Sequence, residues 1–204
     1  MNKPIVNILC RTHNRKEYFQ KCYQSIKSQT YPNYALHVGS DCDCPYYPLA
    51  LPLKTAELEY PQPQPSSYAA PWNKHLETLA EHVVPGYVIY LDDDDKFVDE
   101  NSLQTIVDNL EEDLLLIWRV QITPNFIVPR LEDFGTVIQG GNISGIGIAF
   151  HTKWLPVKWS TWSYGDFRII RELVEDKGIN PKFLNKILTS TQAGAHNGQN
   201  YDNK

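Results

Sequence analysis

Four consecutive aspartates, Asp92–Asp95, follow a short apolar run in this sequence. Neighbouring carboxylates about 4 Å apart repel each other by roughly 4 kcal/mol per pair at an effective dielectric constant of about 20. A divalent cation would relieve that repulsion, and adjacent oxygen ligands suit Mn²⁺ or Mg²⁺ held jointly with substrate phosphates. The same residues could form a solvated acidic turn without a ligand. Their position at the end of a buried strand favours the metal.

Charged side chains also follow the first two strands that the apolar pattern predicts. Arg11, Thr12 and Arg15 come after the first strand, and Asp41 comes after the second. Because ligands of an open α/β sheet bind where the carboxyl ends of its strands converge, we expect these groups to meet the aspartates. Two guanidinium groups beside the start of a helix favour a diphosphate. The same loop could also be a helix cap with surface arginines.

The elements that must position these groups are visible as apolar patterns. Continuous apolar runs predict strands at residues 5–10, 35–40, 87–91, 114–120 and 144–150. Apolar residues at helical spacing predict helices at about residues 15–28, 72–83, 103–110 and 166–177. Because strands and helices alternate, the sequence predicts a single α/β, Rossmann-like domain with a mostly parallel, mixed central sheet flanked by helices.

Local signals mark the ends of some of these elements. Asn14 followed by Glu17 resembles a capping box that would start the first helix at about Arg15. The segment 45–71 contains seven prolines, which exclude long helices and predict an irregular loop. The polar tail 194–204 is rich in Asn and Gly, and we expect it to fray.

Composition limits the class of protein. A chain of 204 residues with 42% apolar and 21% charged residues fits one globular domain. The net charge of −5 and the lack of Lys/Arg-rich runs argue against a nucleic acid partner. No apolar run approaches about 20 residues, so we expect no transmembrane segment and a cytoplasmic location. The cysteines lack C-x-x-C spacing and are interpreted as reduced thiols: Cys10, Cys22, Cys42 and Cys44.

The order of these features resembles the family-2 glycosyltransferases of the GT-A fold. In that family the first strand ends in a turn like Thr12–Arg15, and the next helix ends in a segment like Ser25–Tyr31. The second strand ends in an acidic residue that reads the nucleotide base, matched here by Asp41. An Asn-containing helix follows, matched by Asn73, and then a strand with the acidic motif, matched by Gly86–Asp95.

The resemblance continues in the second half of the chain. An acidic residue that opens a late helix is the family's usual catalytic base and is matched by Asp166, which by itself could be only a helix cap. A histidine near the end can complete the metal shell and is matched by His196, which by itself could be a tail residue. The match covers about residues 4–198, so it implies one GT-A-like domain over 1–198 and a flexible tail at 199–204.

The resemblance implies a metal-dependent, inverting glycosyltransferase of the hexosyl type, active in glycan or polysaccharide synthesis. The donor would be a nucleotide sugar, with UDP favoured over GDP and dTDP, and the acceptor would be a carbohydrate or other hydroxyl compound. Asp166 would be the catalytic base, and Mn²⁺ or Mg²⁺ would be held by Asp92, Asp94 and His196. The residues implied to bind the nucleotide sugar are Arg11, Thr12, Arg15, Asp41, Asn73, Asp92 and Asp93.

Other classes of protein account for part of the pattern. A non-catalytic nucleotide-sugar or carbohydrate-binding module would keep the pocket without turnover, and it is the main alternative. A nucleotidyltransferase would need a glycine-rich first loop, and Arg11–Arg15 contains no glycine. An aspartate phosphohydrolase would need its nucleophilic acid directly after the first strand, where this chain has Arg11 and Thr12.

Aromatic residues gather just before the proposed base. They are Trp154, Trp159, Trp162 and Tyr164. Such side chains could form a stacking platform for an acceptor sugar. Packing in the core is the alternative for at least two of them.

Overall fold

The computed structural model describes residues 3–42, 45, 47–53, 69–135 and 138–192. Its strands are β1 (Val6–Thr12), β2 (Tyr34–Ser40), β3 (Leu51–Pro52), β4 (Tyr87–Tyr90), β5 (Asp95–Phe97), β6 (Leu114–Thr123), β7 (Phe126–Val128), β8 (Ile148–His151) and β9 (Asn180–Thr191). Its α-helices are α1 (Lys16–Lys27), α2 (His75–Ala80), α3 (Ser102–Val107) and α4 (Gly165–Arg171). Shorter helical turns are η2 (Pro71–Lys74), η3 (Gly145–Gly147), η4 (Thr152–Trp154) and η5 (Glu172–Asp176).

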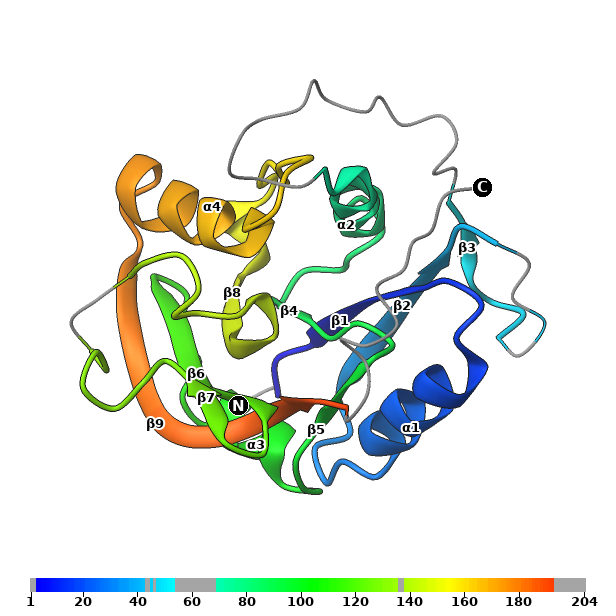
Figure 1. The fold of residues 1–204 in the computed structure, drawn as a ribbon, viewed down its shortest axis with the longest axis horizontal. Coiled ribbons are helices and arrows are strands. Elements are labelled where there is room, and N and C mark those ends of the chain that lie inside the picture. The colour runs from blue at the N-terminus through cyan, green and yellow to red at the C-terminus, as the bar shows by residue number, and fades with distance from the viewer. Residues whose placement is uncertain (1–2, 43–44, 46, 54–68, 136–137, 193–204) are drawn as a thin grey trace.

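All of these strands belong to one mixed sheet (Figure 1). Their order is β3-β2-β1-β4-β8-β6-β9-β5, with β7 paired to β6. β1 pairs in parallel with both β2 and β4, and β2 pairs in parallel with β3. β8 joins this parallel half to β6 through two antiparallel pairings, and β9 then pairs in parallel with β6. The predicted α/β fold with a mixed central sheet is therefore confirmed.

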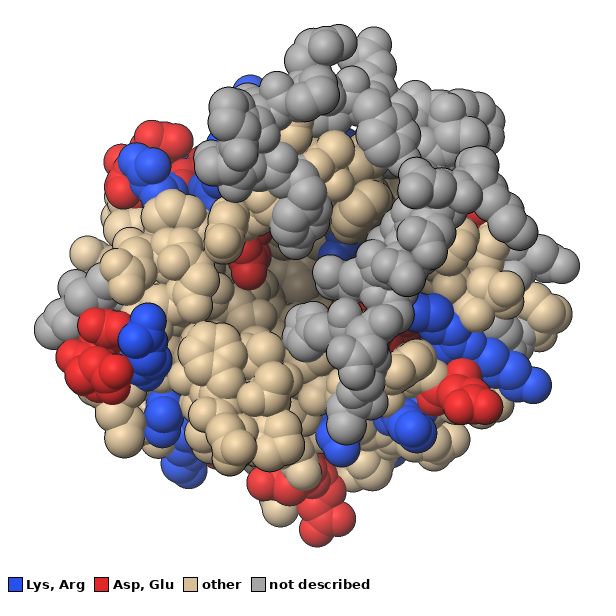
Figure 2. Space-filling model, viewed as in Figure 1, with Lys and Arg blue, Asp and Glu red and all other residues tan. Residues whose placement is uncertain are grey.

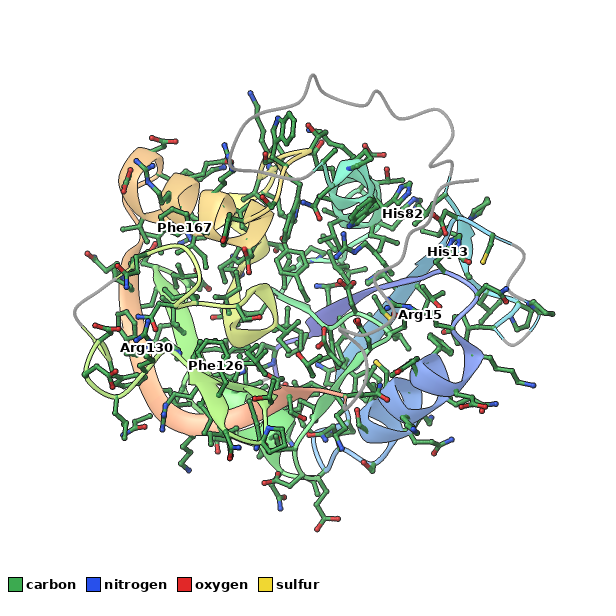
Figure 3. The ribbon with its side chains drawn as sticks, viewed as in Figure 1. His13, Arg15, His82, Phe126, Arg130 and Phe167 are labelled. Atoms are coloured by element: carbon green, nitrogen blue, oxygen red, sulfur yellow. The ribbon has the colours of Figure 1, made fainter. Side chains whose placement is uncertain are left out.

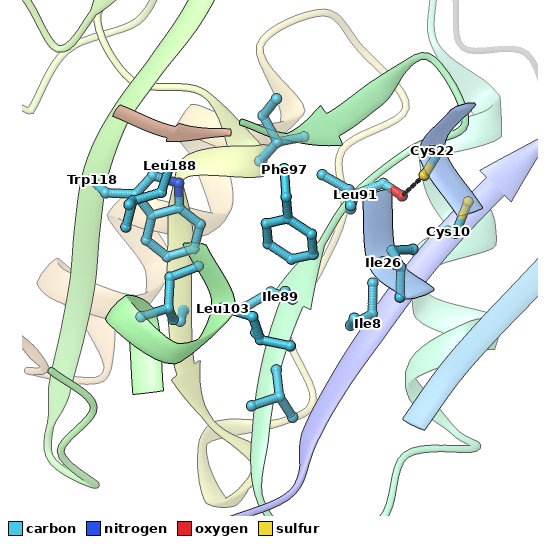
Figure 4. Close-up of a cluster of buried hydrophobic side chains, with 14 of the residues drawn as sticks. Ile8, Cys10, Cys22, Ile26, Ile89, Leu91, Phe97, Leu103, Trp118 and Leu188 are labelled. Carbon is cyan, nitrogen blue, oxygen red and sulfur yellow. Dashed lines mark hydrogen bonds between the residues drawn. The ribbon is translucent and has the colours of Figure 1, made fainter. Parts of the chain in front are cut away.

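Helices cover both faces of the sheet because strand side chains alternate between them. On one face, Ile8 of β1 and Ile89 of β4 pack with residues of α1 and α3, including Ile26 and Leu103 (Figure 4). On the other face, Leu9 of β1 belongs to a second buried cluster that includes residues of α2 and α4. Both faces of the central strands are thus buried, which explains why these strands are continuous apolar runs in the sequence.

Some local predictions are wrong in detail. Asn14 does not cap α1: it lies in the left-handed region at φ 47°, and Arg15 occupies the cap position without a side-chain cap bond. The strand predicted at 144–150 begins instead with the turn η3, and the strand itself spans Ile148–His151. A Cβ on Gly147 would lie 2.6 Å from the Val120 side chain, so this turn packs too closely against β6 for a larger residue.

The longest strand, β9, has no counterpart among the predicted elements. It curves around one side of the molecule, and most of its first seven residues are only partly buried or exposed (Figure 1). β5 pairs only with the last residues of β9. The rest of β9 therefore carries polar side chains, which interrupt the apolar pattern by which a strand is recognised in the sequence. The predicted helix at 166–177 is also divided, with α4 ending at Arg171 and a π-helical turn following.

Several predictions fall on residues outside the described ranges. These concern the tail at 199–204, the metal ligand His196, and Cys44. Cys10, Cys22 and Cys42 are described, and all three are free thiols as predicted. Within the described chain, no helix has both the length and the apolar character that crossing a bilayer requires. The expected cytoplasmic location stays a prediction.

Candidate active site

The carboxyl ends of β1, β2 and β4 meet at one edge of the sheet, as predicted. Thr12 pairs with Ser40, and the amide of Asp93 donates to the carbonyl of Arg11 at 3.1 Å. A pocket of about 450 Å³ opens at this edge, and Figure 2 shows the hollow with acidic and basic side chains in it. The predicted site residues that line it are Arg11, Thr12, Arg15, Asp41, Asn73, Asp92, Asp94 and Asp166.

Asp92 is joined to Arg11 on the pocket wall. The Arg11 Nε donates to Asp92 Oδ1 at 3.0 Å, and a second nitrogen of the guanidinium pairs with Oδ2. Burial works against ionisation of Asp92, but the Arg11 guanidinium outweighs it and lowers the pKa of the carboxyl. Arg11 also donates to Asn73 Oδ1 at 3.1 Å. Asp92 is therefore a charged carboxylate held in a defined orientation.

Asn73 connects this ion pair to the loop before α4. Its Nδ2 donates to the carbonyl of Ser160 at 2.9 Å, while its Oδ1 accepts from Arg11. A Cβ on Gly165 would lie 2.6 Å from that Nδ2, so the start of α4 is packed directly against Asn73. In this structure Asn73 is a positioning residue within the pocket wall.

Asp93 lies behind the pocket wall and is fully buried. Thr12 Oγ1 donates to its Oδ2 at 2.8 Å, and Arg15 Nε donates to the same oxygen at 3.1 Å. Burial raises the pKa of Asp93 to about 7, although Arg15 and Thr12 oppose that rise. Arg15 also donates to Asp94 Oδ2 at 3.0 Å, and it lies near the carboxyl end of β1 (Figure 3). Arg15 thus bridges a buried acid and an acid on the pocket wall.

Asp95 lines the pocket from β5, which the sequence did not predict as a strand. Burial and the neighbouring Asp94 raise the pKa of Asp95 well above its ordinary value. The backbone of the acidic segment is held by Gln192, which follows β9. Its amide donates to the carbonyl of Asp94 at 2.7 Å, and its Nε2 donates to that of Asp93 at 3.0 Å.

Asp166 stands in the first turn of α4, on the opposite wall. Its Oδ2 accepts from the amide of Gly145 at 3.1 Å, and its Oδ1 accepts from the amide of Phe167 at 2.8 Å. Burial raises the pKa of Asp166, and these backbone donors oppose the rise. A carboxyl group with a raised pKa in a pocket is suited to accept a proton near neutral pH.

Asp41 is paired with a histidine that the sequence did not single out as a site residue. His13 Nδ1 lies 2.5 Å from Asp41 Oδ1, and both residues line the pocket. Among the described residues, His13, Asp41 and Cys42 bring nitrogen, oxygen and sulfur donor atoms within 4.8 Å of one another. The aspartates implied to hold the metal are separate from this group.

The two aspartates predicted to supply oxygen ligands for a divalent cation both line the pocket. Asp92 and Asp94 line one pocket, with Asp95 beside them. Sites for Mg²⁺ commonly use one or two carboxylates and complete the shell with substrate phosphates and water. Asp92 and Asp94 could supply two such carboxylates. Asp92 and Asp94 are paired with Arg11 and Arg15, so an ion would share these carboxylates with the guanidinium groups.

Comparison with solved structures identifies the fold of the chain. No protein-family model matches the chain, and no curated protein matches it by sequence. TarS of S. aureus superposes with a TM-score of 0.70 at 13% identity, over 93% of this chain and 37% of that one. Its 1–349 fragment in complex with UDP-GlcNAc gives 0.61 at 15% identity, over 92% and 58%. Mannosyltransferase PcManGT of Pyrobaculum calidifontis, in complex with GDP-Man and Mn²⁺, gives 0.58 at 14% identity, over 93% and 57%.

The chain has a glycosyltransferase-like fold. It spans only 37% to 60% of the length of the TarS structures. At identities of 13% to 15% the likeness concerns the fold alone. The assignment of roles to side chains therefore depends on the geometry of this pocket.

Sequence reasoning did not name every residue that lines the pocket. Tyr90, at the end of β4, and Ser163, just before α4, both contribute to the wall. Trp159 also lines the pocket and is buried, as is Trp162. Tyr164 is 54% exposed and adopts a left-handed conformation at φ 60°. Of the four aromatic residues proposed as a stacking platform, Trp159 and Trp162 are thus buried, and Trp159 and Tyr164 line the pocket.

Proposed function

We propose that this chain is a metal-dependent glycosyltransferase of the hexosyl type, which moves a sugar from a nucleotide sugar to an acceptor hydroxyl. One observation carries the proposal: Asp166, whose pKa is raised, shares a pocket with Asp92, Asp94 and two guanidinium groups. The pocket therefore combines a base with groups of both charges that suit a metal-bound diphosphate. The likeness in fold to proteins solved with UDP-GlcNAc and with GDP-Man supports the same class of ligand.

Asp166 would act as the base in a single displacement. The acceptor oxygen attacks the anomeric carbon, its proton passes to the Asp166 carboxylate, and the bond from that carbon to the diphosphate oxygen breaks. One such displacement inverts the anomeric centre. The amides of Gly145 and Phe167 hold both carboxylate oxygens, so the base is oriented before the acceptor arrives.

The opposite wall would hold the donor. We propose that Asp92 and Asp94, with His196, bind Mn²⁺ or Mg²⁺, which when bound neutralises the leaving diphosphate. Arg11 and Arg15 add positive charge on the same wall, and Asp41 would accept from the nucleotide base. Thr12 and Asp93 would support Arg15 from behind. A UDP-sugar is the proposed donor, and glycan or polysaccharide synthesis is the proposed role.

A thermal-shift panel tests the donor and the metal together. UDP-, GDP- and dTDP-sugars would each be added with and without Mn²⁺, against the matching nucleoside diphosphates. A ligand at 100 times its dissociation constant stabilises the fold by about 2.7 kcal/mol. We expect a Mn²⁺-dependent rise in melting temperature with a UDP-sugar. The absence of such a rise with every sugar nucleotide would contradict the proposal.

Asp166→Asn separates an enzyme from a binding module. Loss of a general base lowers the rate by about 100- to 10,000-fold, so transfer should fall by that factor while donor affinity is unchanged. Asp176→Asn is a matched control, because Asp176 ends the π-helical turn η5 and does not line the pocket. If the wild-type chain binds the donor but neither transfers nor hydrolyses it, the chain is a non-catalytic binding module.

A further inference from the structure

Three buried polar atoms, from residues that line the pocket, have no hydrogen-bond partner in the part of the chain that the structure describes. They are Tyr90 Oη, Trp159 Nε1 and Ser163 Oγ, and Gln192 Oε1 is the fourth such atom in the described part of the chain. Tyr90, Trp159 and Ser163 are 3%, 5% and 3% exposed, and all three line the pocket. Nearly all buried polar groups in folded proteins are paired, so three unpaired atoms in one pocket require an explanation.

Tyr90 and Trp159 are held rigidly beside each other. Their rings pack edge to face, with centroids 5.1 Å apart and planes at 88°. Burial raises the pKa of the Tyr90 phenol and the neighbouring indole opposes that rise, but no bond with hydrogen-bond geometry joins the two groups. The backbone amide of Trp159 donates to Glu77 Oε1 at 2.6 Å, which anchors the indole from α2.

Two of these residues stand close in the sequence to the acidic wall and to the proposed base. Tyr90 precedes Asp92 by two residues, and Ser163 precedes Asp166 by three. A Cβ built on Gly145 would lie 3.1 Å from the Cβ of Asp166 and 3.7 Å from Cη2 of Trp159. The indole and the proposed base thus pack against the same glycine. A group bound beside Asp166 in the pocket would lie near the Trp159 indole and the Tyr90 ring packed against it, and Ser163 lines the same pocket.

The chemistry of the three groups selects the kind of ligand. The indole only donates, whereas the two hydroxyls both donate and accept. All three can hydrogen-bond the hydroxyl groups of a sugar, and none of them supplies the positive charge that would neutralise a carboxylate. Asp92 and Asp166 are acidic, and Arg11, which lies with them in the pocket, is already paired with Asp92. A carboxylate on the sugar would face these acids without a counter-charge of its own.

We infer that Tyr90, Trp159 and Ser163 form the subsite that recognises the hydroxyl groups of the transferred sugar, and that this subsite selects an uncharged hexose over a hexuronate. The inference rests on the proposed function and specifies its substrate class. A site built to hydrogen-bond a hydroxyl group discriminates strongly, because its polar atoms stay unpaired when the wrong ligand binds.

Nuclear magnetic resonance of the indole N–H groups tests the inference in the wild-type chain. The probes are UDP, UDP-glucose and UDP-glucuronate with Mn²⁺, and GDP and GDP-mannose in parallel. The Trp159 signal, assigned from Trp159→Phe, should shift with the hexose nucleotide and stay in place with the nucleoside diphosphate. Trp118 and Trp154 are internal controls, because their Nε1 atoms already donate to Thr189 Oγ1 and to the carbonyl of Glu112, each at 2.9 Å.

Variants give an independent measurement by calorimetry. Tyr90→Phe and Ser163→Ala should each weaken binding of the hexose nucleotide by about 3- to 10-fold, the range for one neutral hydrogen bond, and leave binding of UDP or GDP unchanged. Trp154→Phe is the control and should change neither. UDP-glucuronate should bind no more tightly than UDP.

The outcomes separate the two proposals. Suppose that the hexose nucleotide binds, but that it does not shift the Trp159 signal and that Tyr90→Phe and Ser163→Ala do not weaken its binding. The subsite is then wrong while the proposed function stands. The subsite is also wrong if the glucuronate binds as tightly as the glucose compound. If none of the sugar nucleotides binds with Mn²⁺, the proposed function itself fails. Circular dichroism of each variant establishes that it is folded, and the wild-type spectra are decisive if a variant is not.

Discussion

Tyr90→Phe should make the protein more stable in the absence of ligand. The Tyr90 hydroxyl is buried at the end of β4 and has no hydrogen-bond partner among the described residues. A buried polar group without a partner costs about 1–3 kcal/mol of desolvation, and phenylalanine removes the hydroxyl while keeping the ring. The ring contacts with Trp159 and Phe150 are therefore expected to persist. We expect the free energy of unfolding to rise by about 1–2 kcal/mol, toward the low end of that penalty.

The effect is large enough to measure by calorimetry and by urea unfolding. For a chain of this size, 1 kcal/mol corresponds to a shift of about 2–4 °C in melting temperature. Tyr31→Phe is the matched control, because Tyr31 is equally buried but its hydroxyl donates to the carbonyl of Pro4. That variant should lose about 1 kcal/mol, since it removes a bond that the fold already makes.

The two variants should thus move in opposite directions. If Tyr90→Phe melts lower than the wild-type protein, as Tyr31→Phe should, then the Tyr90 hydroxyl is satisfied within the fold, for example by buried water. The reasoning that reserves this atom for a ligand would then be refuted. A rise in stability together with weaker binding of a hexose nucleotide would show that the hydroxyl contributes to ligand binding and lowers the stability of the ligand-free protein.

Three further predictions concern the charged wall and the strained turn. Because burial raises the pKa of Asp166, kcat/KM should increase with pH above the ordinary carboxyl range. The folded state binds the Asp166 carboxyl proton more tightly than the unfolded state does. The free energy of unfolding of the wild-type protein should therefore fall relative to that of Asp166→Asn as the pH rises above about 4, which urea unfolding at several pH values measures. In the same assay, Arg15→Met should lower the free energy of unfolding by about 1–3 kcal/mol above pH 7, where the buried Asp93 carboxyl is ionised and paired with Arg15, and by less below pH 7, where that carboxyl is protonated; a loss that does not change with pH would contradict this. Tyr164→Gly should raise stability by about 1 kcal/mol by relieving the left-handed conformation, and an unchanged melting temperature would argue against strain there.

The central strands could be predicted because their sequences are continuously apolar. β1 and β4 are buried on both faces, so they are uninterrupted apolar runs, and their carboxyl ends locate the charged residues of the site. β9 lacks this property, since its early positions such as Lys182 and Lys186 are polar and its neighbour β5 is only three residues long. A continuous apolar run marks a strand only when both of its faces are buried.

Pairing across the chain could not be predicted. The sequence indicated two arginines for a diphosphate and four aspartates for a metal, and the structure joins Arg11 to Asp92 across 81 positions. Nothing local in either segment specifies that partner. The capping box predicted at Asn14 is absent for a related reason. The spacing of Asn14 and Glu17 fits the motif, but the backbone of Asn14 lies in the left-handed region, and its amide donates to Cys42 Sγ at 3.0 Å, a contact distant in the sequence.

The contact of Gln192 with the acidic segment indicates the order in which parts of the chain fold during synthesis. β1, β4 and the aspartates leave the ribosome long before β9 does, yet three carbonyls of the acidic segment accept hydrogen bonds from Gln192, which follows β9. Contacts so distant along the chain form late in folding. A nascent chain that lacks β9 would hold its carboxylates on a backbone without the Gln192 contacts, so the acidic edge of the pocket should take its final shape only when the sheet is complete.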